Sequence, residues 1–439
     1  MTKRCAVIGG GPAGCTAAYE LQKAGMQVEL FEATPQIGGR TTTWRDKGLI
    51  HDSGAGFFTN FYPNLQSYVA ELELESEVVK LSRKNGLVDD GQAAIFQLGS
   101  LRSFLSFPFA SWRSKIKMLR ETCLHTLKYR HDQLYDCAKL ATYDDESVAT
   151  YIHRRCGQEV YDYFIRPGIE PFWYFSCEDV SKALLLALHA KAANAEFFTF
   201  KEGMDTFCRQ ITKNLSVHTM SPVENIECRA NTFEISTPKQ SLSFEHVVVA
   251  TTASTAKRLS QNIKPELVNT MQRQFLTQQQ YAANIHASYL VPKRLCPKEI
   301  STLCACGPGE HPIAAIGFGS SKNQNDAGAL KDQELVAVFL SDKKSKELLN
   351  YSGGSLYEKI WHEARKFYPS LARKAEPYKI IQRAEAIPVH SVGRYKAAAQ
   401  FWQEQKAPFV FAGDYLSTAT VDGAIWSGKM AAEKITEGL

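Results

Sequence analysis

Apolar and polar positions near the start of the chain alternate with two different periods. Residues 4–8 form a short, apolar and partly β-branched run, which predicts a buried strand. Small and apolar residues then recur at helical spacing through residues 12–25, and Gly25 is placed to end that helix. Residues 27–31 predict a second strand. The pattern therefore predicts a strand–helix–strand unit with a glycine-rich turn before the helix.

The glycines of this turn have separate expected tasks. Gly9 allows the tight turn, Gly11 lets the backbone approach a pyrophosphate, and Gly14 lets the helix pack closely on the strand. Glu32 ends the second strand, where a carboxylate accepts from both ribose hydroxyls of an adenosine and repels a 2′-phosphate. The unit predicts dinucleotide binding, with the phosphates at the helix N-terminus, but it does not separate FAD from NAD. Its expected cofactor residues are Gly9, Gly11, Pro12, Ala13, Gly14 and Glu32.

Further along the chain, helical and strand patterns occupy different stretches. Residues 103–195 predict mostly helix, whereas residues 283–345 predict strands such as 286–291 and 335–340. Residues 246–251 contain an apolar run, which is typical of a parallel strand that is covered on both faces. No internal repeat or low-complexity linker interrupts these stretches. The pattern favours interleaved lobes over separate domains joined by linkers.

Two motifs far apart in the chain carry a family resemblance. After Glu32, residues 37–40 read Ile-Gly-Gly-Arg and residues 51–55 read His-Asp-Ser-Gly-Ala. Near the end, Phe-Ala-Gly-Asp at 411–414 precedes Val-Asp-Gly-Ala-Ile-Trp-Ser-Gly at 421–428. In this order the motifs resemble the FAD-dependent amine oxidase superfamily, the flavin-containing amine oxidoreductases. That superfamily includes monoamine oxidases, protoporphyrinogen oxidases and carotenoid desaturases.

The resemblance implies an α/β fold with a doubly wound, Rossmann-like FAD-binding domain of the GR2 type and an interleaved α+β substrate-binding domain. Residues 1–75, 195–282 and 400–439 would build the FAD-binding domain, because the strands of a dinucleotide sheet come from distant parts of a chain. Residues 76–194 and 283–399 would build the substrate-binding domain. A chain of 439 residues is long enough for two or three lobes.

The resemblance also assigns residues to FAD. Arg40 would place a guanidinium beside the pyrophosphate or the flavin, and Asp414 would accept from the ribityl chain or lie near the phosphates. Val223 would hold the adenine through its backbone. A helix that opens at Val421 would direct its first amides to the ring, where they stabilise negative charge. The alternative is a solvated loop cation at position 40 and an ordinary amphipathic last helix. The residues that the resemblance adds are Gly39, Arg40, Val223, Gly413, Asp414, Val421 and Ala424.

Amine oxidases of this superfamily use side chains that this sequence lacks at the aligned positions. Their lysine near flavin N5 aligns with Asn284 or Ile285, and no lysine occurs between Lys264 and Lys293. One of the two aromatic rings that guide an amine aligns with Thr420. Simple amine oxidation is therefore not favoured.

Residues 386–395 instead resemble the protoporphyrinogen oxidase-like branch. His390 stands where that branch often has a tyrosine, so it is a candidate acid or base near the flavin, with a structural histidine as the alternative. No second glycine motif follows a strand, so the flavin would take a hydride directly from the substrate and pass electrons to oxygen or another acceptor. No cysteine follows Cys306, which predicts non-covalent FAD.

A cluster of aromatic residues in the helical stretch is a candidate substrate pocket. Aromatic side chains give a flat, apolar lining that suits a ring or a polyene. Plain core packing is the alternative. The cluster consists of Phe172, Trp173, Tyr174 and Phe175.

Composition limits the possible partners. The net charge of +5 is spread along the chain, so no nucleic-acid partner is expected. Basic and apolar residues alternate at helical spacing in residues 112–120, which predicts a solvated helix face or, alternatively, a helix at a membrane surface. No apolar run is long enough to span a bilayer.

Cysteines and the first residues bear on location. The 11 cysteines are scattered without a CxxC pair, and no metal-ligand set accompanies them or the 11 histidines. The first strand begins almost at once, which leaves no room for a signal or transit peptide. We therefore expect a reduced, cytoplasmic protein without a metal.

Together these patterns predict an FAD-dependent oxidoreductase, either an oxidase or a dehydrogenase. It would remove a hydride from a C–C or C–N bond of a small, apolar, cyclic organic substrate. The alternatives are a carotenoid-type desaturase or isomerase in peripheral contact with a membrane, and a flavin-binding protein without turnover.

Overall fold

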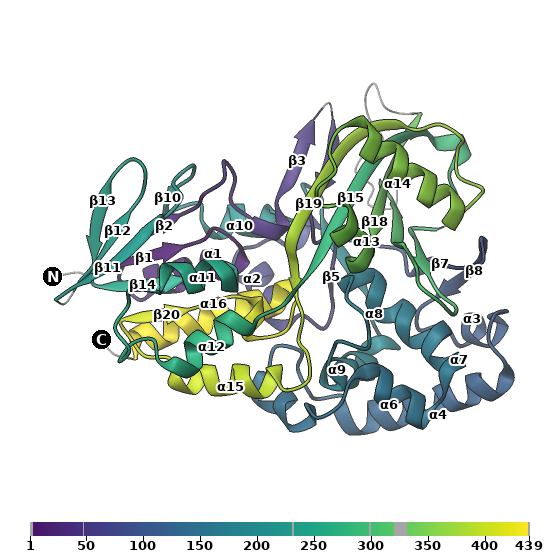
Figure 1. Ribbon diagram of the computed structural model, residues 1–439, viewed down its shortest axis with the longest axis horizontal. Coiled ribbons are helices and arrows are strands. Elements are labelled where there is room, and N and C mark those ends of the chain that lie inside the picture. The colour runs from purple at the N-terminus through teal and green to yellow at the C-terminus, as the bar shows by residue number, and fades with distance from the viewer. Residues whose placement is uncertain (1–2, 47, 231, 298–299, 320–331, 438–439) are drawn as a thin grey trace.

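The computed structural model describes residues 3–46, 48–230, 232–297, 300–319 and 332–437. A five-stranded parallel sheet forms the centre of the part that holds both ends of the chain (Figure 1). Its strands come from three distant segments, as the strands of dinucleotide-binding sheets do, and the predicted α/β, Rossmann-like fold class is confirmed. In spatial order the strands are β10 (Ser216–His218), β2 (Gln27–Phe31), β1 (Arg4–Ile8), β14 (His246–Val249) and β20 (Phe409–Phe411).

Two helices that contact each other cover this sheet. Helix α1 (Pro12–Lys23) follows β1 directly and ends just before Gly25, whose φ is 84°. The last helix, α16 (Val421–Thr436), packs along α1, and a Cβ at Gly428 would overlap the carbonyl oxygen of Ala13. The close approach of the two helices therefore depends on glycine at position 428.

Shorter elements surround the sheet. Helices α2 (Pro63–Glu71) and α10 (Thr206–Ile211) pack against α16 and α1, respectively. An antiparallel sheet of three strands precedes β14. Its strands are β11 (Asn225–Arg229), β12 (Thr232–Ser236) and β13 (Ser241–Phe244). The remaining helices of this part are α11 (Ala253–Leu259), α12 (Thr270–Gln278) and α15 (Arg394–Glu404).

A larger sheet of seven strands stands beside the first part (Figure 1). All of its pairings are antiparallel except the one between β16 and β7. Helices α13 (Asp342–Leu348) and α14 (Gly354–Phe367) pack on it and enclose a second apolar core. In spatial order the strands are β19 (Glu376–Pro388), β15 (Tyr281–Pro292), β18 (Gln333–Leu340), β17 (Ile313–Phe318), β16 (Thr302–Ala305), β7 (Lys84–Asp89) and β8 (Gln92–Gln97).

A helical segment lies below the seven-stranded sheet in Figure 1. Its fourth helix, α6, and its last helix, α9, pack together, and α8 reaches up to β16 and β17. The segment agrees with the helical pattern expected from residue 103 onward. Its helices are α3 (Leu101–Ser106), α4 (Trp112–Tyr129), α5 (Cys137–Leu140), α6 (Val148–Arg155), α7 (Gln158–Val160), α8 (Arg166–Trp173) and α9 (Lys182–Ala192).

Two small antiparallel sheets connect these parts. One consists of β3 (Thr43–Asp46) and β4 (Leu49–Asp52), and the other of β5 (Phe58–Thr59), β9 (Phe197–Phe200) and β6 (Val78–Lys80). All 11 cysteines are free thiols. Within the described ranges, every helix is too short or too polar to cross a membrane. The boundaries of the two predicted domains stay a prediction.

Candidate active site

A cavity of about 1110 Å³ lies where the parallel sheet, the seven-stranded sheet and the helical segment meet. It begins at the carboxyl ends of β1, β2 and β14, which is the edge where open α/β sheets bind ligands. From there it continues past the N-terminus of α16 to α8, α3 and α4. A site of this size accommodates a large ligand and leaves room beside it.

The predicted cofactor residues gather at the first end of this cavity. Gly14 is the exception, because it lies behind the turn, in the contact between α1 and β1. The predicted residues that line the cavity are Gly9, Gly11, Pro12, Ala13, Glu32, Gly39, Arg40, Val223, Gly413, Asp414, Val421 and Ala424.

Of the three glycines to which the sequence assigns a task in this turn, only one has free space beside its Cα atom. Gly9 has a φ of 107°, and a Cβ there would lie 2.5 Å from the carbonyl oxygen of Ala250. A Cβ at Gly14 would overlap the carbonyl oxygen of Gly9. At Gly11, by contrast, a Cβ would meet no atom within 4 Å. Gly9 and Gly14 are therefore required by the fold, whereas Gly11 leaves space for a ligand at the N-terminus of α1.

The carboxylate of Glu32 is fixed at the cavity wall by backbone donors. Its Oε2 accepts from the amide of Gly10 at 2.7 Å, and its Oε1 accepts from the amide of Thr34 at 2.8 Å. The hydroxyl of Thr34 donates to the same Oε1 at 2.7 Å. A carboxylate has about four acceptor positions, so capacity remains for a ribose hydroxyl.

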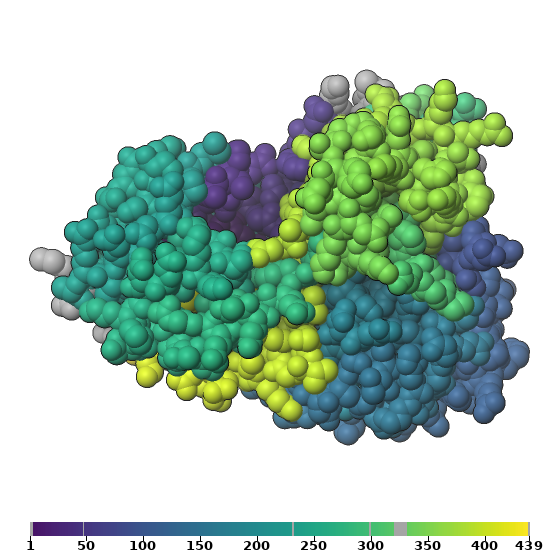
Figure 2. Space-filling view, viewed as in Figure 1, coloured from purple at the N-terminus to yellow at the C-terminus, as the bar shows by residue number. Residues whose placement is uncertain are grey.

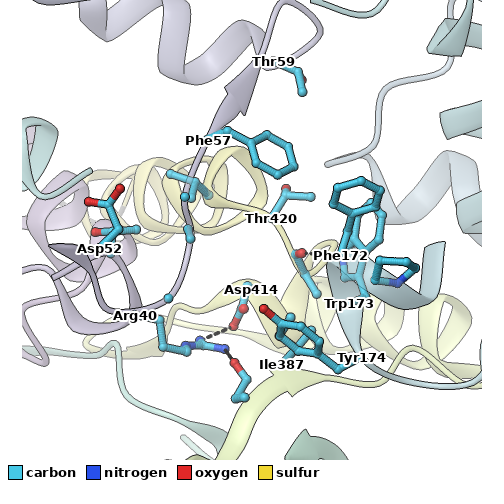
Figure 3. A pocket seen from close by; sticks show the side chains of 18 of the residues that line it. Arg40, Asp52, Phe57, Thr59, Phe172, Trp173, Tyr174, Ile387, Asp414 and Thr420 are labelled. Carbon is cyan, nitrogen blue, oxygen red and sulfur yellow. Dashed lines mark hydrogen bonds and ion pairs between the residues drawn. The ribbon is translucent and has the colours of Figure 1, made fainter. Parts of the chain in front are cut away.

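Arg40 joins three segments at the middle of the cavity. Its Nη2 donates to Oδ1 of Asp414 at 2.7 Å, and its Nη1 donates to the carbonyl oxygen of Ala386 at 3.0 Å (Figure 3). Burial lowers the pKa of Arg40, but attraction from Asp414, Tyr281 and Glu385 together with the hydrogen bond to Asp414 raises it above its usual value. The solvated-cation alternative does not describe this side chain. Its remaining N–H donors can serve a phosphate or a flavin oxygen.

The N-terminus of α16 opens at the predicted residue. Thr420 caps the helix, because its Oγ1 accepts from the amide of Gly423 at 2.9 Å. Asp422 in the first turn faces away from the cavity and accepts from the amide of Leu65 at 2.9 Å and from Nδ2 of Asn64 at 3.0 Å. Burial raises the pKa of Asp422 to about 6. These contacts hold the helix start against α2. The open turn at Gly11, the donors of Arg40 and this helix start fit FAD.

Aromatic side chains form the wall beyond Thr420. Trp173 donates from Nε1 to the carbonyl oxygen of Ala419 at 2.8 Å, which fixes α8 beside the start of α16. Phe172 meets Phe57 edge to face at 5.7 Å between ring centroids, and Tyr174 stacks on Phe339 at 6.2 Å. Figure 3 shows Phe57, Phe172 and Trp173 around the same open space.

Phe175 corrects the prediction for the fourth member of the cluster. It is 2% exposed, lies outside the cavity lining and stacks on Trp173 at 6.4 Å. The reason is local, because Tyr174 ends α8 with a φ of 65° and reverses the chain toward the core. Core packing, the alternative considered for the whole cluster, applies to this residue.

His390 is also corrected as a candidate acid or base. It is 2% exposed, lies outside the cavity lining and stacks on Tyr395 at 4.9 Å. Burial, with the charge of Arg394, lowers the pKa of His390 to about 3, so the ring is neutral near pH 7. It is a core histidine.

The two positions that align with the amine-oxidase lysine differ in their surroundings. Asn284 lines the cavity, with its Nδ2 donating to the carbonyl oxygen of Leu340 at 3.1 Å, whereas Ile285 is buried in the second core. None of the described residues that line the cavity is a lysine. The described residues also hold no group of three or more His, Cys, Asp or Glu that could bind a metal ion.

Arg383 on β19 is a cavity residue that the sequence analysis missed. It faces Asn284 across the β15–β19 pair, and its Nη2 donates to Oγ of Ser53 at 2.9 Å. Burial and the charge of Arg40 lower the pKa of Arg383 below its usual value. An arginine in a strand carries no motif, so only its register opposite Asn284 could have indicated it.

Comparison with known proteins gives the family. The model for "flavin containing amine oxidoreductase" matches residues 12–436. Protoporphyrinogen oxidase 2, chloroplastic/mitochondrial, of Arabidopsis thaliana is 31% identical over 168 residues, which cover 38% of this chain and 32% of that protein. Coproporphyrinogen III oxidase of Bacillus subtilis is 22% identical over 249 residues, which cover 49% of this chain and 52% of that protein. The match thus spans only about a third to a half of these relatives.

The fold has solved counterparts over its whole length. The crystal structure of a putative protoporphyrinogen oxidase from Exiguobacterium sp. 255-15 superposes with a TM-score of 0.78 at 16% identity, covering 100% of both chains. At this identity the likeness shows the fold alone. The family model spans nearly the whole chain, so this match establishes family membership as well as the fold. The chain belongs to the flavin containing amine oxidoreductase family and resembles its protoporphyrinogen oxidase-like members, so the predicted family of FAD-dependent oxidoreductases is confirmed.

Proposed function

We propose that this flavin containing amine oxidoreductase oxidises an apolar, ring-shaped organic substrate by removing a hydride from a C–C or C–N bond. Bound FAD would accept the hydride, and dioxygen or another acceptor would then take the electrons. The chain's own part is to bind and orient the substrate and to keep water away from it.

The observation that carries this proposal is the aromatic lining of the cavity beyond Thr420, which we call the aromatic wall. From Phe172 the wall continues through Phe57, whose ring meets Phe197 at 5.2 Å. Phe104 and Phe164 continue it toward α3, with 5.1 Å between their rings. Aromatic faces of this kind bind flat apolar rings through dispersion and edge-to-face contacts. The wall therefore supports a large planar substrate over a small aliphatic amine.

One charged side chain of the cavity lining, Arg383, supports a more specific class of substrate. Arg383 uses two of its donors on Ser53, and a guanidinium has five N–H donors in all. The remaining donors suit an acidic substituent at the rim of an apolar ring. Porphyrinogens combine a macrocycle with acidic side chains, so they are our first candidates among cyclic substrates.

The lining suggests how oxidation would proceed without a lysine. Asn284, one of the two candidate aligned positions, donates its amide to the carbonyl oxygen of Leu340, and a side-chain amide supplies no base. Hydride removal needs the donor C–H bond held in line with the acceptor, and the wall around Trp173 would provide that alignment. Alignment, and not acid–base chemistry, is therefore the proposed contribution of the side chains.

Binding of the oxidised rings tests the proposal without turnover. Coproporphyrin III and protoporphyrin IX should quench tryptophan fluorescence of the holoenzyme saturably, and Phe172→Ala should weaken this binding about tenfold. Tyr351→Ala, at an exposed ring outside the cavity lining, is the matched control. Binding that is unchanged in Phe172→Ala, or absent in the wild type, would contradict a ring-binding wall.

A polyene substrate taken at a membrane surface is the second candidate. It is favoured by the outer face of α4, where Trp112, Ile116 and Leu127 are exposed by 62%, 65% and 73%. A flavin-binding protein without turnover would show no substrate-dependent bleaching of the flavin with either class of compound.

A further inference from the structure

Buried polar side chains on α4 and α9 lead to one end of the cavity. Thr122 on α4 and His189 on α9 line the cavity, and His125 and Glu121 lie behind them with 1% and 0% of their surfaces exposed. The two helices pack on each other within the helical segment, which Figure 2 shows in blue beneath the green part of the chain. Polar groups in such a place cost free energy unless hydrogen bonds satisfy them, so their partners indicate what they do.

The ring nitrogens of both histidines have hydrogen-bond partners. Nε2 of His189 lies 2.9 Å from Oγ1 of Thr122, and Nδ1 of His189 lies 2.8 Å from Nδ1 of His125. Nε2 of His125 lies 2.9 Å from the hydroxyl oxygen of Tyr151 and 3.6 Å from Oε2 of Glu121. Because each of these hydrogen bonds fixes a ring, the chain of partners holds His189 against Thr122.

Both rings are neutral near pH 7. Burial, together with the neighbouring His125, lowers the pKa of His189 to about 3, and burial lowers the pKa of His125 to about 4. The charge of Glu121 opposes the shift at both rings, whereas Arg155 and Lys128 add to it at His125. A neutral imidazole carries one N–H donor and one acceptor nitrogen. The two histidines therefore bring no net charge to the cavity.

The hydroxyl of Thr122 is left as a hydrogen-bond acceptor. Its Oγ1 lies 2.9 Å from the carbonyl oxygen of Met118 and 2.9 Å from Nε2 of His189. A hydroxyl has one proton and two lone pairs. If the proton goes to Met118, His189 donates to one lone pair and the other stays free. If the proton goes to His189, both lone pairs stay free. In either arrangement Thr122 can accept from a ligand without breaking a hydrogen bond.

The surroundings of Thr122 make this acceptor selective. We call the part of the cavity that α3, α4 and α9 line its helical end. These three helices lie entirely within the described residues, and the polar side chains that they contribute to the lining are Thr122 and His189. Their other lining residues are apolar, among them Leu101, Phe104 and Leu188. A hydrogen bond is strong in such surroundings, and a polar group that lacks one is costly.

We propose that Thr122 is a specificity-determining residue, whose Oγ1 accepts a hydrogen bond from an uncharged N–H or O–H group of the ligand that fills the helical end. A charged ammonium group would also donate, but the lining residues of these fully described helices include no carboxylate to offset its charge. That this ligand is the substrate rests on the proposed function. On that basis a ring that carries N–H groups fits this end of the cavity, whereas a hydrocarbon polyene has no group to donate.

Equilibrium dialysis of the FAD-loaded enzyme with carbazole and with fluorene tests the inference. Both probes are flat, apolar molecules of three fused rings and of nearly equal size, and fluorene has a CH₂ group where carbazole has its N–H. The wild type should bind carbazole about tenfold more tightly than fluorene, because only carbazole donates to Thr122.

Variants of Thr122 assign the effect to one atom. Thr122→Val keeps the shape of the side chain and removes Oγ1, so the affinity for carbazole should fall about tenfold while the affinity for fluorene stays within about twofold. Thr122→Ser keeps the hydroxyl and should keep the preference for carbazole. Thr277→Val is the matched control, because Thr277 also donates to a carbonyl oxygen four residues earlier, that of Arg273 at 2.8 Å, but lies on α12 outside the cavity lining. FAD content, measured by absorbance, shows that each variant is folded.

Three results would overturn the inference. The wild type would bind carbazole and fluorene equally, Thr122→Val would keep the preference for carbazole, or neither probe would bind to the wild type. A failure of the proposed function is distinguishable, because porphyrinogens would then fail to reduce the flavin while the wild type still prefers carbazole and Thr122→Val does not.

Discussion

Arg40 and Asp414 are 374 positions apart in the sequence, and their side chains form an ion pair with 2.7 Å between Nη2 and Oδ1. Arg40 follows the second strand of the parallel sheet, and Asp414 follows its last strand, β20. The second hydrogen bond of Arg40, to Ala386, reaches the end of β19 in the seven-stranded sheet. The pair therefore fixes a cation at the point where both sheets border the cavity.

Arg40→Met should weaken FAD binding. The variant loses a cation and its donors, and a hydrogen bond to a charged group contributes about 1.5–3 kcal/mol, so the dissociation constant for FAD should rise about tenfold or more. Arg229→Met, which removes an exposed arginine paired with Glu227, serves as the control. Titration of the apoproteins with FAD, followed by flavin fluorescence, measures the effect. Equal affinity in Arg40→Met and the wild type would show that Arg40 only ties the sheets together.

Gly11→Val should lose FAD while the protein still folds. A Cβ at this position meets no protein atom within 4 Å, so a branched side chain collides only with a bound cofactor. Gly354→Val is the control, since position 354 is also open but lies on α14, away from the cavity. Circular dichroism and bound-flavin absorbance separate folding from cofactor content. A yellow Gly11→Val protein with full FAD content would show that the glycine motif is an ordinary turn and does not bind the cofactor.

Val421→Pro should keep FAD but change its reduction. Val421 is the first residue of α16, where proline is favoured and the N–H has no helical partner. Thr420 before it is extended, with φ −140° and ψ 160°, as a residue before proline requires. The substitution removes one amide at the cavity, so the midpoint potential of the flavin should become more negative. Val421→Ala keeps the amide and should retain the wild-type potential; a shift in both variants would point to the side chain instead.

Asp422→Asn should flatten the pH dependence of stability. Burial raises the pKa of Asp422 to about 6 in the folded protein, from an ordinary value of 3.8. The folded protein then binds more protons than the unfolded chain, so this group stabilises the fold most below pH 4, and that stability is lost as the pH rises through about 6. This difference in pKa corresponds to about 3 kcal/mol in the free energy of unfolding.

The measurement for Asp422→Asn is the melting temperature between pH 4 and pH 8. The variant should match the wild type near pH 4 and exceed it near pH 8, because the amide carries no buried charge and still accepts from Leu65. Asp422→Ala, which loses that hydrogen bond, should be less stable than Asp422→Asn at every pH. If the plots of melting temperature against pH ran parallel for Asp422→Asn and the wild type, another group would cause the pH dependence of stability.

Helices and strands could be predicted from the sequence where a local pattern of residues determines them. The strand at 4–8 matches β1, the strand at 27–31 matches β2, and the last helix begins at Val421 as expected. In each case a period of two or 3.6 residues, together with glycine or a capping residue, determines the element without help from distant residues. The residues that gather around the cofactor end of the cavity belong to these same local motifs.

Side-chain direction after an element ends could not be predicted in this way. Phe175 turns into the core because Tyr174 adopts a positive φ, and His390 turns inward against Tyr395 after β19 ends at Pro388. Arg383 reaches the cavity through a pairing with β15 that contains two register shifts. Such shifts depend on tertiary packing, so a strand pattern in one segment does not reveal them.

Anaerobic reduction of the bound flavin tests the central claim most directly. Holoenzyme is mixed in a stopped-flow instrument with coproporphyrinogen III, protoporphyrinogen IX, phytoene, putrescine or cyclohexylamine, and the flavin absorbance is followed. The account predicts that a porphyrinogen bleaches the flavin at least about a hundredfold faster than either amine, a difference of about 2.7 kcal/mol in barrier. Rapid bleaching by the amines alone, or no bleaching by any of the five, would contradict it.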